Sequence, residues 1–186
     1  MPNHCYTHIS VEEKYKEKLE EISKVGLCRY YRPMPEEIRK TTSPSRLVTE
    51  SEYNDQMKEN ETAKLKRYPI TKEMQRDLLC KYGHDNWYNW AAENWGTKWG
   101  CYENDFNDST YSFTSAWCPV DDSIIELLAK DIPNFTYNYE EEQGWGSNIE
   151  YEDGIEISRN DFEEFEDVNA DLDFSDSIDN LKNLKL

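Results

Sequence analysis

Apolar and polar residues alternate in several short stretches of this chain, which is the pattern of a strand with one buried face. Residues 111–117 are the clearest case, because Tyr111, Phe113, Ser115 and Trp117 fall on the same side. Further short strands are expected at residues 4–9, 27–31, 135–139 and 149–151. The pattern therefore predicts five strands spread over most of the chain.

Apolar residues spaced by three and four predict helices between these strands. The first begins at Ser10, which precedes Glu13 by three residues as in a capping box, and it ends at Gly26. Its apolar stripe consists of Val11, Tyr15, Leu19 and Ile22. Later helices are expected from Thr71 to Tyr82, from a cap at Asp85 to Trp95, and from Pro119 to Pro133, with a solvated helix near 51–65.

The order of these elements is β-α-β, a helical excursion, a second β-α-β and one extra strand. This order is typical of a ferredoxin-like α+β sandwich, in which helices cover one face of an antiparallel sheet. The sequence thus predicts a ferredoxin-like domain over residues 1–153 with an insertion at about 32–100. Residues 154–186 are expected to form an acidic C-terminal extension.

Charge is distributed unevenly along the chain. The whole chain has a net charge of −18, yet residues 1–139 hold 23 acids and 18 bases. Residues 140–186 hold 16 acids and three bases, a net of −13. Such a surplus disfavours direct binding of nucleic acid or of an anionic membrane, and it favours a basic partner.

Composition limits the class of protein further. No apolar run approaches the roughly 20 residues that cross a bilayer, and the N-terminus lacks the pattern of a signal peptide, so a cytoplasmic location in a bacterial host cell is expected. The five cysteines lie far apart, and we expect reduced thiols.

Four segments resemble the YubB-like proteins of phages and plasmids. They are Met1–Asn3, Pro33–Glu37 (PMPEE), Asp85–Trp99 (DNWYNWAAENWGTKW) and Phe113–Pro119 (FTSAWCP). The resemblance covers roughly residues 1–152 and implies a ferredoxin-like fold and a gene carried on mobile elements, but it implies no reaction. Two departures are His4, where an aromatic residue is expected, and residues 160–186, which extend past the usual end of the family.

The tryptophan-rich segment allows two interpretations. Its indole rings could stack on nucleobases, but such sites need cations for the phosphates, and only Lys98 lies inside the segment. The alternative, which we favour from sequence, is a small core that fixes the inserted helices to the sheet. The residues concerned are Trp87, Trp90, Trp95, Trp99 and Trp117.

No catalytic residue, cofactor or metal site is predicted. His4, Cys5 and His8 lack the third and fourth ligands that zinc requires, and the pair Cys80 and His84 lacks an orienting acid. The chain is therefore expected not to be an enzyme.

Residues 160–186 combine acids with apolar residues at helical spacing, which favours a docked or partner-binding helix over a merely solvated tail. The leading hypothesis is an anti-defence protein of a mobile element. Its acids would occupy the basic nucleic-acid channel of a host CRISPR effector or restriction enzyme. Alternatives are a host-takeover interaction module, or a nucleotide-binding or enzymatic domain that uses the aromatic cleft. The expected partner-binding residues are Glu140, Glu141, Glu142, Glu152, Asp153, Asp161, Phe162, Glu163, Glu164, Phe165, Glu166, Asp167, Asp171 and Asp173.

Overall fold

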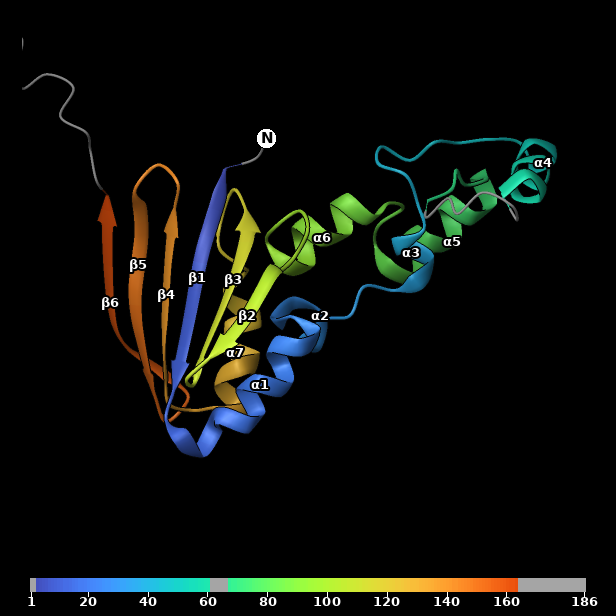
Figure 1. Ribbon diagram of the computed structural model, residues 1–186. Helices are drawn as coiled ribbons and strands as arrows, with labels where there is room; N and C mark the ends of the chain where they lie inside the picture. The colour runs from blue at the N-terminus through green and yellow to red at the C-terminus, as the bar shows by residue number, and fades with distance from the viewer. Residues whose placement is uncertain (1–2, 61–66, 164–186) are drawn as a thin grey trace, which may run out of the picture.

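Six strands form one antiparallel sheet in the computed structural model, which describes residues 3–60 and 67–163 (Figure 1). Their spatial order is β2-β3-β1-β4-β5-β6. The strands are β1 His4–Val11, β2 Tyr102–Asn107, β3 Thr110–Ala116, β4 Phe135–Glu141, β5 Trp145–Glu152 and β6 Ile155–Glu163. With its helices the protein has a mixed α+β fold, as the sequence predicts.

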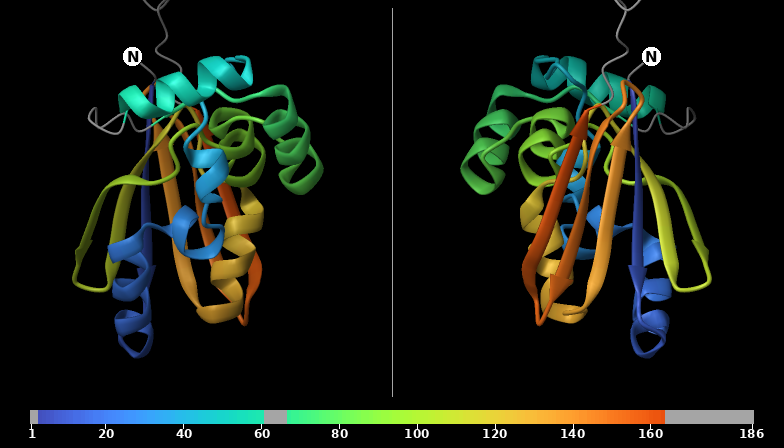
Figure 2. Two further views of the ribbon diagram at one scale, coloured as in Figure 1. Left: turned by 90° about the vertical axis from the view of Figure 1, so that its right-hand side faces the viewer. Right: turned by 90° about the vertical axis from the view of Figure 1, so that its left-hand side faces the viewer.

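The central part of the fold follows the order β1-α1-β2-β3-α7-β4, which is the β-α-β-β-α-β order of ferredoxin-like domains. The helices α1 (Lys16–Val25) and α7 (Asp122–Asp131) lie on one face of the sheet, and the opposite face carries no helix among the described residues (Figure 2). The strands β5 and β6 extend the sheet beyond β4. The fold thus has one covered face, one open face and an added edge.

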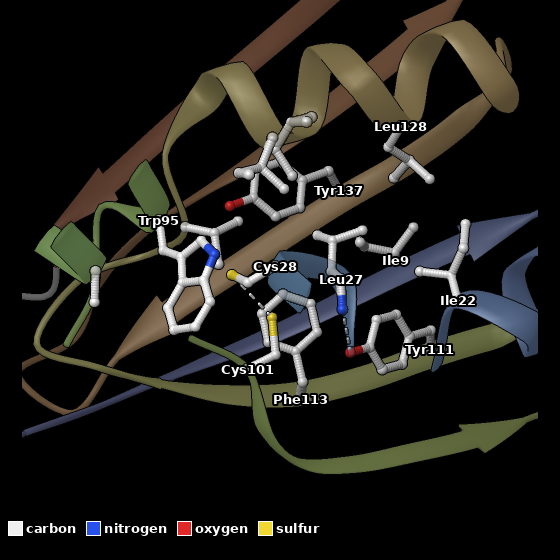
Figure 3. Packing of buried hydrophobic residues seen from close by; sticks show 14 of the residues in the cluster. Ile9, Ile22, Leu27, Cys28, Trp95, Cys101, Tyr111, Phe113, Leu128 and Tyr137 are labelled. Carbon is white, nitrogen blue, oxygen red and sulfur yellow. Dashed lines mark hydrogen bonds between the residues drawn. The ribbon is translucent and has the colours of Figure 1, made fainter. Parts of the chain in front are cut away.

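The core lies between the sheet and its helices. In β1, Ile9 is fully buried on the covered face, whereas Tyr6 on the open face is 45% exposed. Figure 3 shows the packing around β1 and β3. There the backbone N–H of Leu27 donates a hydrogen bond to the hydroxyl of Tyr111 over 3.2 Å, so that a buried polar pair fixes the start of a helix against the sheet.

A helical region is inserted between α1 and β2. Its helices are α2 Leu27–Tyr31, α3 Glu36–Arg39, α4 Glu50–Asn60, α5 Lys72–Tyr82 and α6 Trp87–Trp95. Helix α6 lies beside the sheet, while α4 and α5 lie farther from it (Figure 1). The side chains of Thr71 and Asn86 cap α5 and α6, and Gly83 and Gly96 end them in the left-handed conformation. No described helix is long and apolar enough to cross a bilayer.

Two predictions for the N-terminal third are wrong. Residues 27–31 form helix α2, because Leu27 and the adjacent Cys28 are both fully buried, which a strand with one buried face does not allow. Ser10 does not cap a helix but belongs to β1, where its hydroxyl bonds that of Thr110 over 2.9 Å. The helix starts later, after a 3-10 turn (η1) at Glu13–Tyr15.

Two strands were not expected from the sequence. The strand β2 is polar and exposed along most of its length, and its pairing with β3 is interrupted by a bulge between Tyr102 and Asp105. The strand β6 pairs with β5 from Glu163 opposite Trp145 to Ile155 opposite Glu152. The expected boundary at 153/154 therefore falls in a tight turn, and residues 155–163 belong to the sheet.

Candidate functional site

The described acids that were expected to bind a partner lie at two ends of β5. Glu140 pairs with Gly146, and Glu163 pairs with Trp145. Because Trp145 and Gly146 begin β5, both glutamates lie near the turn that joins β4 to β5. Glu152 begins the turn at the other end. Since β5 has eight residues, these ends are roughly 23 Å apart. The structure therefore brings Glu140, Glu142, Asp161 and Glu163 to one end and leaves Glu152 and Asp153 at the other.

Glu141 is not a surface charge. Its side chain is only 2% exposed, and a carboxylate oxygen accepts a hydrogen bond from the backbone N–H of Gln143 over 2.8 Å. A carboxylate that bonds the backbone inside a turn fixes the turn and offers little to a partner. The expectation that Glu141 binds a partner is therefore wrong, whereas Glu142 is exposed.

Phe162 lies in a strand and not on the expected helix. It pairs with Gly146, and its ring covers that glycine so closely that an added Cβ would lie 2.6 Å from the ring. Gly146 in turn pairs with Glu140, so Phe162 and Glu140 share the open face of the sheet. Asp161 points to the opposite face, because side chains alternate along a strand. The acids at this end are thus divided between two faces.

We call residues 135–163, which form β4, β5, β6 and their turns, the acidic edge. It holds nine acids and a single base, Arg159. The acids are Glu140, Glu141, Glu142, Glu150, Glu152, Asp153, Glu156, Asp161 and Glu163. Arg159 bonds Glu156 over 2.8 Å, and this hydrogen bond lowers the pKa of Glu156. Seven exposed acids therefore have no base within the edge.

The other residues expected to bind a partner lie outside the part of the chain that the structure describes. They are Glu164, Phe165, Glu166, Asp167, Asp171 and Asp173. The helix expected over residues 160–186 is wrong for residues 160–163, which belong to β6, and stays a prediction for the rest.

The tryptophans of the cluster do not form a single core. Trp87, Trp90 and Trp95 are buried in or beside α6, with at most 8% of each exposed. Trp99 and Trp117 are 39% and 43% exposed. The core interpretation is therefore confirmed for the first three, while the other two place large aromatic surfaces in contact with solvent.

A cleft lies beside these tryptophans. The sequence offered an aromatic cleft only as an alternative and did not predict the cations that line it. The cleft lies among α2, α3, α6 and the loops that follow them, and its volume is about 350 Å³. Its lining residues are Arg29, Pro33, Met34, Glu36, Arg39, Arg67, Trp87, Trp95, Lys98 and Trp99. We call it the basic cleft, because four cations and one acid line it in a chain whose net charge is −18.

Two of the cations lie over aromatic rings. The guanidinium carbon of Arg67 is 3.9 Å from the ring centre of Trp87, and the ammonium of Lys98 is 4.9 Å from that of Trp99. The indole N–H of buried Trp87 finds no hydrogen-bond partner among the described residues. The cleft therefore combines aromatic rings with cations.

The sequence did not reveal the basic character of this cleft, because its cations are far apart in the chain. Only Lys98 lies within the tryptophan segment, whereas Arg29, Arg39 and Arg67 come from α2, α3 and a loop. One signal was available: the Pro33–Glu37 segment and the tryptophan segment, both quoted for the resemblance, line the same cleft.

The histidines have ordinary partners. The ring of His4 bonds the hydroxyl of Tyr102 over 3.1 Å, that of His8 bonds Ser112 over 2.8 Å, and that of His84 lies 2.8 Å from a carboxylate oxygen of Glu93. The described residues contain no group of three or more His, Cys, Asp or Glu side chains that could hold a metal. The expectations about metals and catalysis stay predictions.

The chain was compared with family models, curated proteins and solved structures. No family model and no curated protein matches the chain. Among solved structures, protein api92 from Yersinia pseudotuberculosis, assigned to the family DUF1281, is similar with a TM-score of 0.46 and 8% sequence identity. The match covers 89% of this chain and 99% of that chain. At this level the likeness carries no functional argument, and the YubB-like resemblance stays a prediction.

Proposed function

We propose that the chain is a non-catalytic binding protein that inhibits a host defence nuclease through its acidic edge. The observation that carries the proposal is the density of carboxylates in this edge, where seven exposed acids have no base within the edge and Arg159 bonds only Glu156. Such a surface matches a basic channel that normally holds nucleic acid, such as that of a CRISPR effector or a restriction enzyme. The same proposal places the protein in the cytoplasm of a bacterial host and its gene on a mobile element.

The geometry suits association with a protein surface in two ways. Exposed carboxylates on both faces of the edge raise the rate of encounter with a basic surface. Phe162, which lies half-buried over Gly146 and close to Glu140, offers apolar area beside these charges. The charges give long-range attraction, and the ring adds a contact that salt does not screen.

The same charges have a second explanation. Natural sheets protect exposed edge strands with charged residues, which prevent pairing between molecules. Since β6 is an edge strand, its acids could serve only this purpose. A useful experiment must therefore separate loss of partner binding from self-association.

The test replaces Glu140, Glu142, Asp161 and Glu163 together with their amides, which keeps side-chain shape and removes four charges. A matched control makes the same change at four exposed acids elsewhere: Glu17, Glu50, Asp108 and Glu126. If each charge contributes about 0.3 kcal/mol, the first variant should inhibit DNA cleavage by its target about tenfold less well. The control should inhibit like the parent.

The measurement is DNA cleavage by purified CRISPR effectors and restriction enzymes at low and high salt, with size-exclusion chromatography of each variant. Inhibition that weakens with salt and is relieved by added DNA supports mimicry. Equal inhibition by both variants contradicts it. Unchanged inhibition with new oligomers of the first variant would show that the acids only protect the edge.

A further inference from the structure

The basic cleft has the chemistry of a ligand site that differs from the acidic edge. Arg29, Arg67 and Lys98 have no carboxylate within 4.0 Å among the residues that the structure describes. Arg39 is the exception, since its Nε donates to Glu36 over 2.7 Å. Unpaired cations that line one hollow repel one another, so a multivalent anion would stabilise them.

The aromatic walls of the cleft supply the second element of recognition. The guanidinium carbon of Arg67 lies over the ring of Trp87, 3.9 Å from its centre, and Trp99, which also lines the cleft, is 39% exposed. Trp99 and Tyr102 form a T-shaped pair with ring centres 5.9 Å apart, and the ammonium of Lys98 lies 4.9 Å from the ring centre of Trp99. A nucleobase stacks on such faces, and arginine planes take part in the same stacks.

We propose that this cleft binds a free nucleotide. Its base would stack beside Trp99, and its phosphates would lie among Arg29, Arg67 and Lys98. The volume of about 350 Å³ falls within the range of small-molecule sites. A nucleic-acid strand is disfavoured, because its remaining phosphates would lie near a protein of net charge −18.

The proposal does not depend on the proposed function, because the two sites share no residue. The amide variant of Glu140, Glu142, Asp161 and Glu163 should therefore bind nucleotides as the parent does. Loss of nucleotide binding and loss of nuclease inhibition are separable results.

The test titrates the full chain with adenosine, AMP, ADP, ATP, inorganic phosphate and a five-nucleotide single strand. Binding is followed by calorimetry and by tryptophan fluorescence. We expect a phosphorylated nucleotide to quench fluorescence and to bind about tenfold or more tightly than adenosine, because charged hydrogen bonds hold its phosphates. Phosphate alone should not quench, since it has no ring.

Two exposed cations are then replaced, Arg29→Gln and Arg67→Gln, with Arg76→Gln on α5 as the control because it lies outside the cleft. Each cleft variant should weaken nucleotide binding about tenfold, while the control should not. Trp99→Leu should weaken the binding of ATP and of adenosine by the same factor, because it removes only the stacking of the base on the indole ring. Thermal unfolding of each variant checks that the fold is intact.

Three results would overturn the proposal. They are the absence of binding by every nucleotide at millimolar concentration, equal binding by the cleft variants and the parent, and tighter binding of the single strand than of the nucleotides. The last result would identify the cleft as a nucleic-acid site.

Discussion

The acidic edge and the basic cleft are opposite in charge and are built differently. The edge is continuous in sequence, over residues 135–163, and consists of regular strands joined by tight turns. The cleft collects cations from Arg29 to Lys98 out of short helices and loops. A charge run along the chain therefore reveals the edge, whereas only the folded structure reveals that four cations line the cleft.

This difference shows what net charge does and does not exclude. A value of −18 disfavours a long polyanion, because repulsion acts over the whole surface at distances up to the Debye length. It does not argue against a small anion in a local hollow, where four cations and one acid set the potential. The two regions can therefore serve two different ligands.

A glycine supports each region, and the acidic edge gives the larger expected effect. A methyl group at Gly146 would lie 2.1 Å from the carbonyl oxygen of Tyr139 and 2.6 Å from the Phe162 ring. Gly146→Ala should therefore lower the free energy of unfolding by about 3 kcal/mol, although alanine normally stabilises a strand. Urea unfolding measures the loss, and hydrogen exchange should show faster opening of β6.

Ser158→Ala is the control for this prediction, because Ser158 is exposed and lies in β6 on the same face. It should change stability by less than about 0.5 kcal/mol. Nucleotide binding in the cleft should survive Gly146→Ala under conditions where the variant stays folded. A Gly146→Ala variant as stable as the parent would contradict the packing described for Phe162.

The corresponding change in the cleft is Gly100→Ala. An added Cβ would lie 3.1 Å from the Trp95 ring and 3.3 Å from the Cβ of Cys28, at a backbone φ of +66°. Gly83→Ala is the matched control, because its φ is +75° and nothing lies within 4 Å. Gly83→Ala should cost about 1 kcal/mol from backbone strain, and Gly100→Ala about 2 kcal/mol, since it also displaces Trp95.

Only Gly100→Ala should also change the cleft, because Trp95 lines it. Its tryptophan fluorescence spectrum should shift, whereas that of Gly83→Ala should match the parent. Equal losses of stability in the two variants, as measured by urea unfolding, would show that the space around Trp95 is not tight.

The sequence predicted the elements whose pattern reports burial on one side. The strand β3 and the helices α5 and α7 have clear apolar periods, and side-chain caps such as Thr71 mark where helices begin. The strands β2 and β6 were not predicted because they are almost wholly exposed. Their sequences therefore lack the alternation of buried apolar and exposed polar residues. Their place in the sheet comes from backbone pairing, which leaves no apolar signature.

The sequence also predicted one candidate site better than the other, because only the acidic edge is continuous in the chain. Counting charges located the acidic edge, but it could not tell that Glu141 folds back into its own turn. Nor could it tell that Glu152 lies one strand length from Glu140. To predict the cleft, one would have to know that Arg67 contacts Trp87. These residues are 20 positions apart, and only the packing of the inserted helices brings them together.

The smallest expected effect concerns Arg159, the only base of the acidic edge. Its hydrogen bond lowers the pKa of Glu156 below the ordinary value of 4.5, so the pair stabilises the folded state at neutral pH. That stability is lost as the pH falls through the lowered pKa. Because both side chains are about one-third exposed, at 32% and 34%, Arg159→Gln should cost only about 0.5 kcal/mol at pH 7.

The difference in unfolding free energy between Arg159→Gln and the parent should shrink toward zero as the pH falls through the lowered pKa of Glu156. It should also shrink in 1 M salt, which screens the ion pair. The same variant removes the one positive charge of the edge, so the net charge of the edge becomes more negative by one. If the edge binds a basic partner, Arg159→Gln should therefore bind slightly more tightly at low salt, by up to about twofold, although it is less stable. Lys24→Gln, which removes an exposed cation from α1, makes the same change in net charge and should leave affinity unchanged. Equal gains in both variants would show that total charge, and not the edge, attracts the partner.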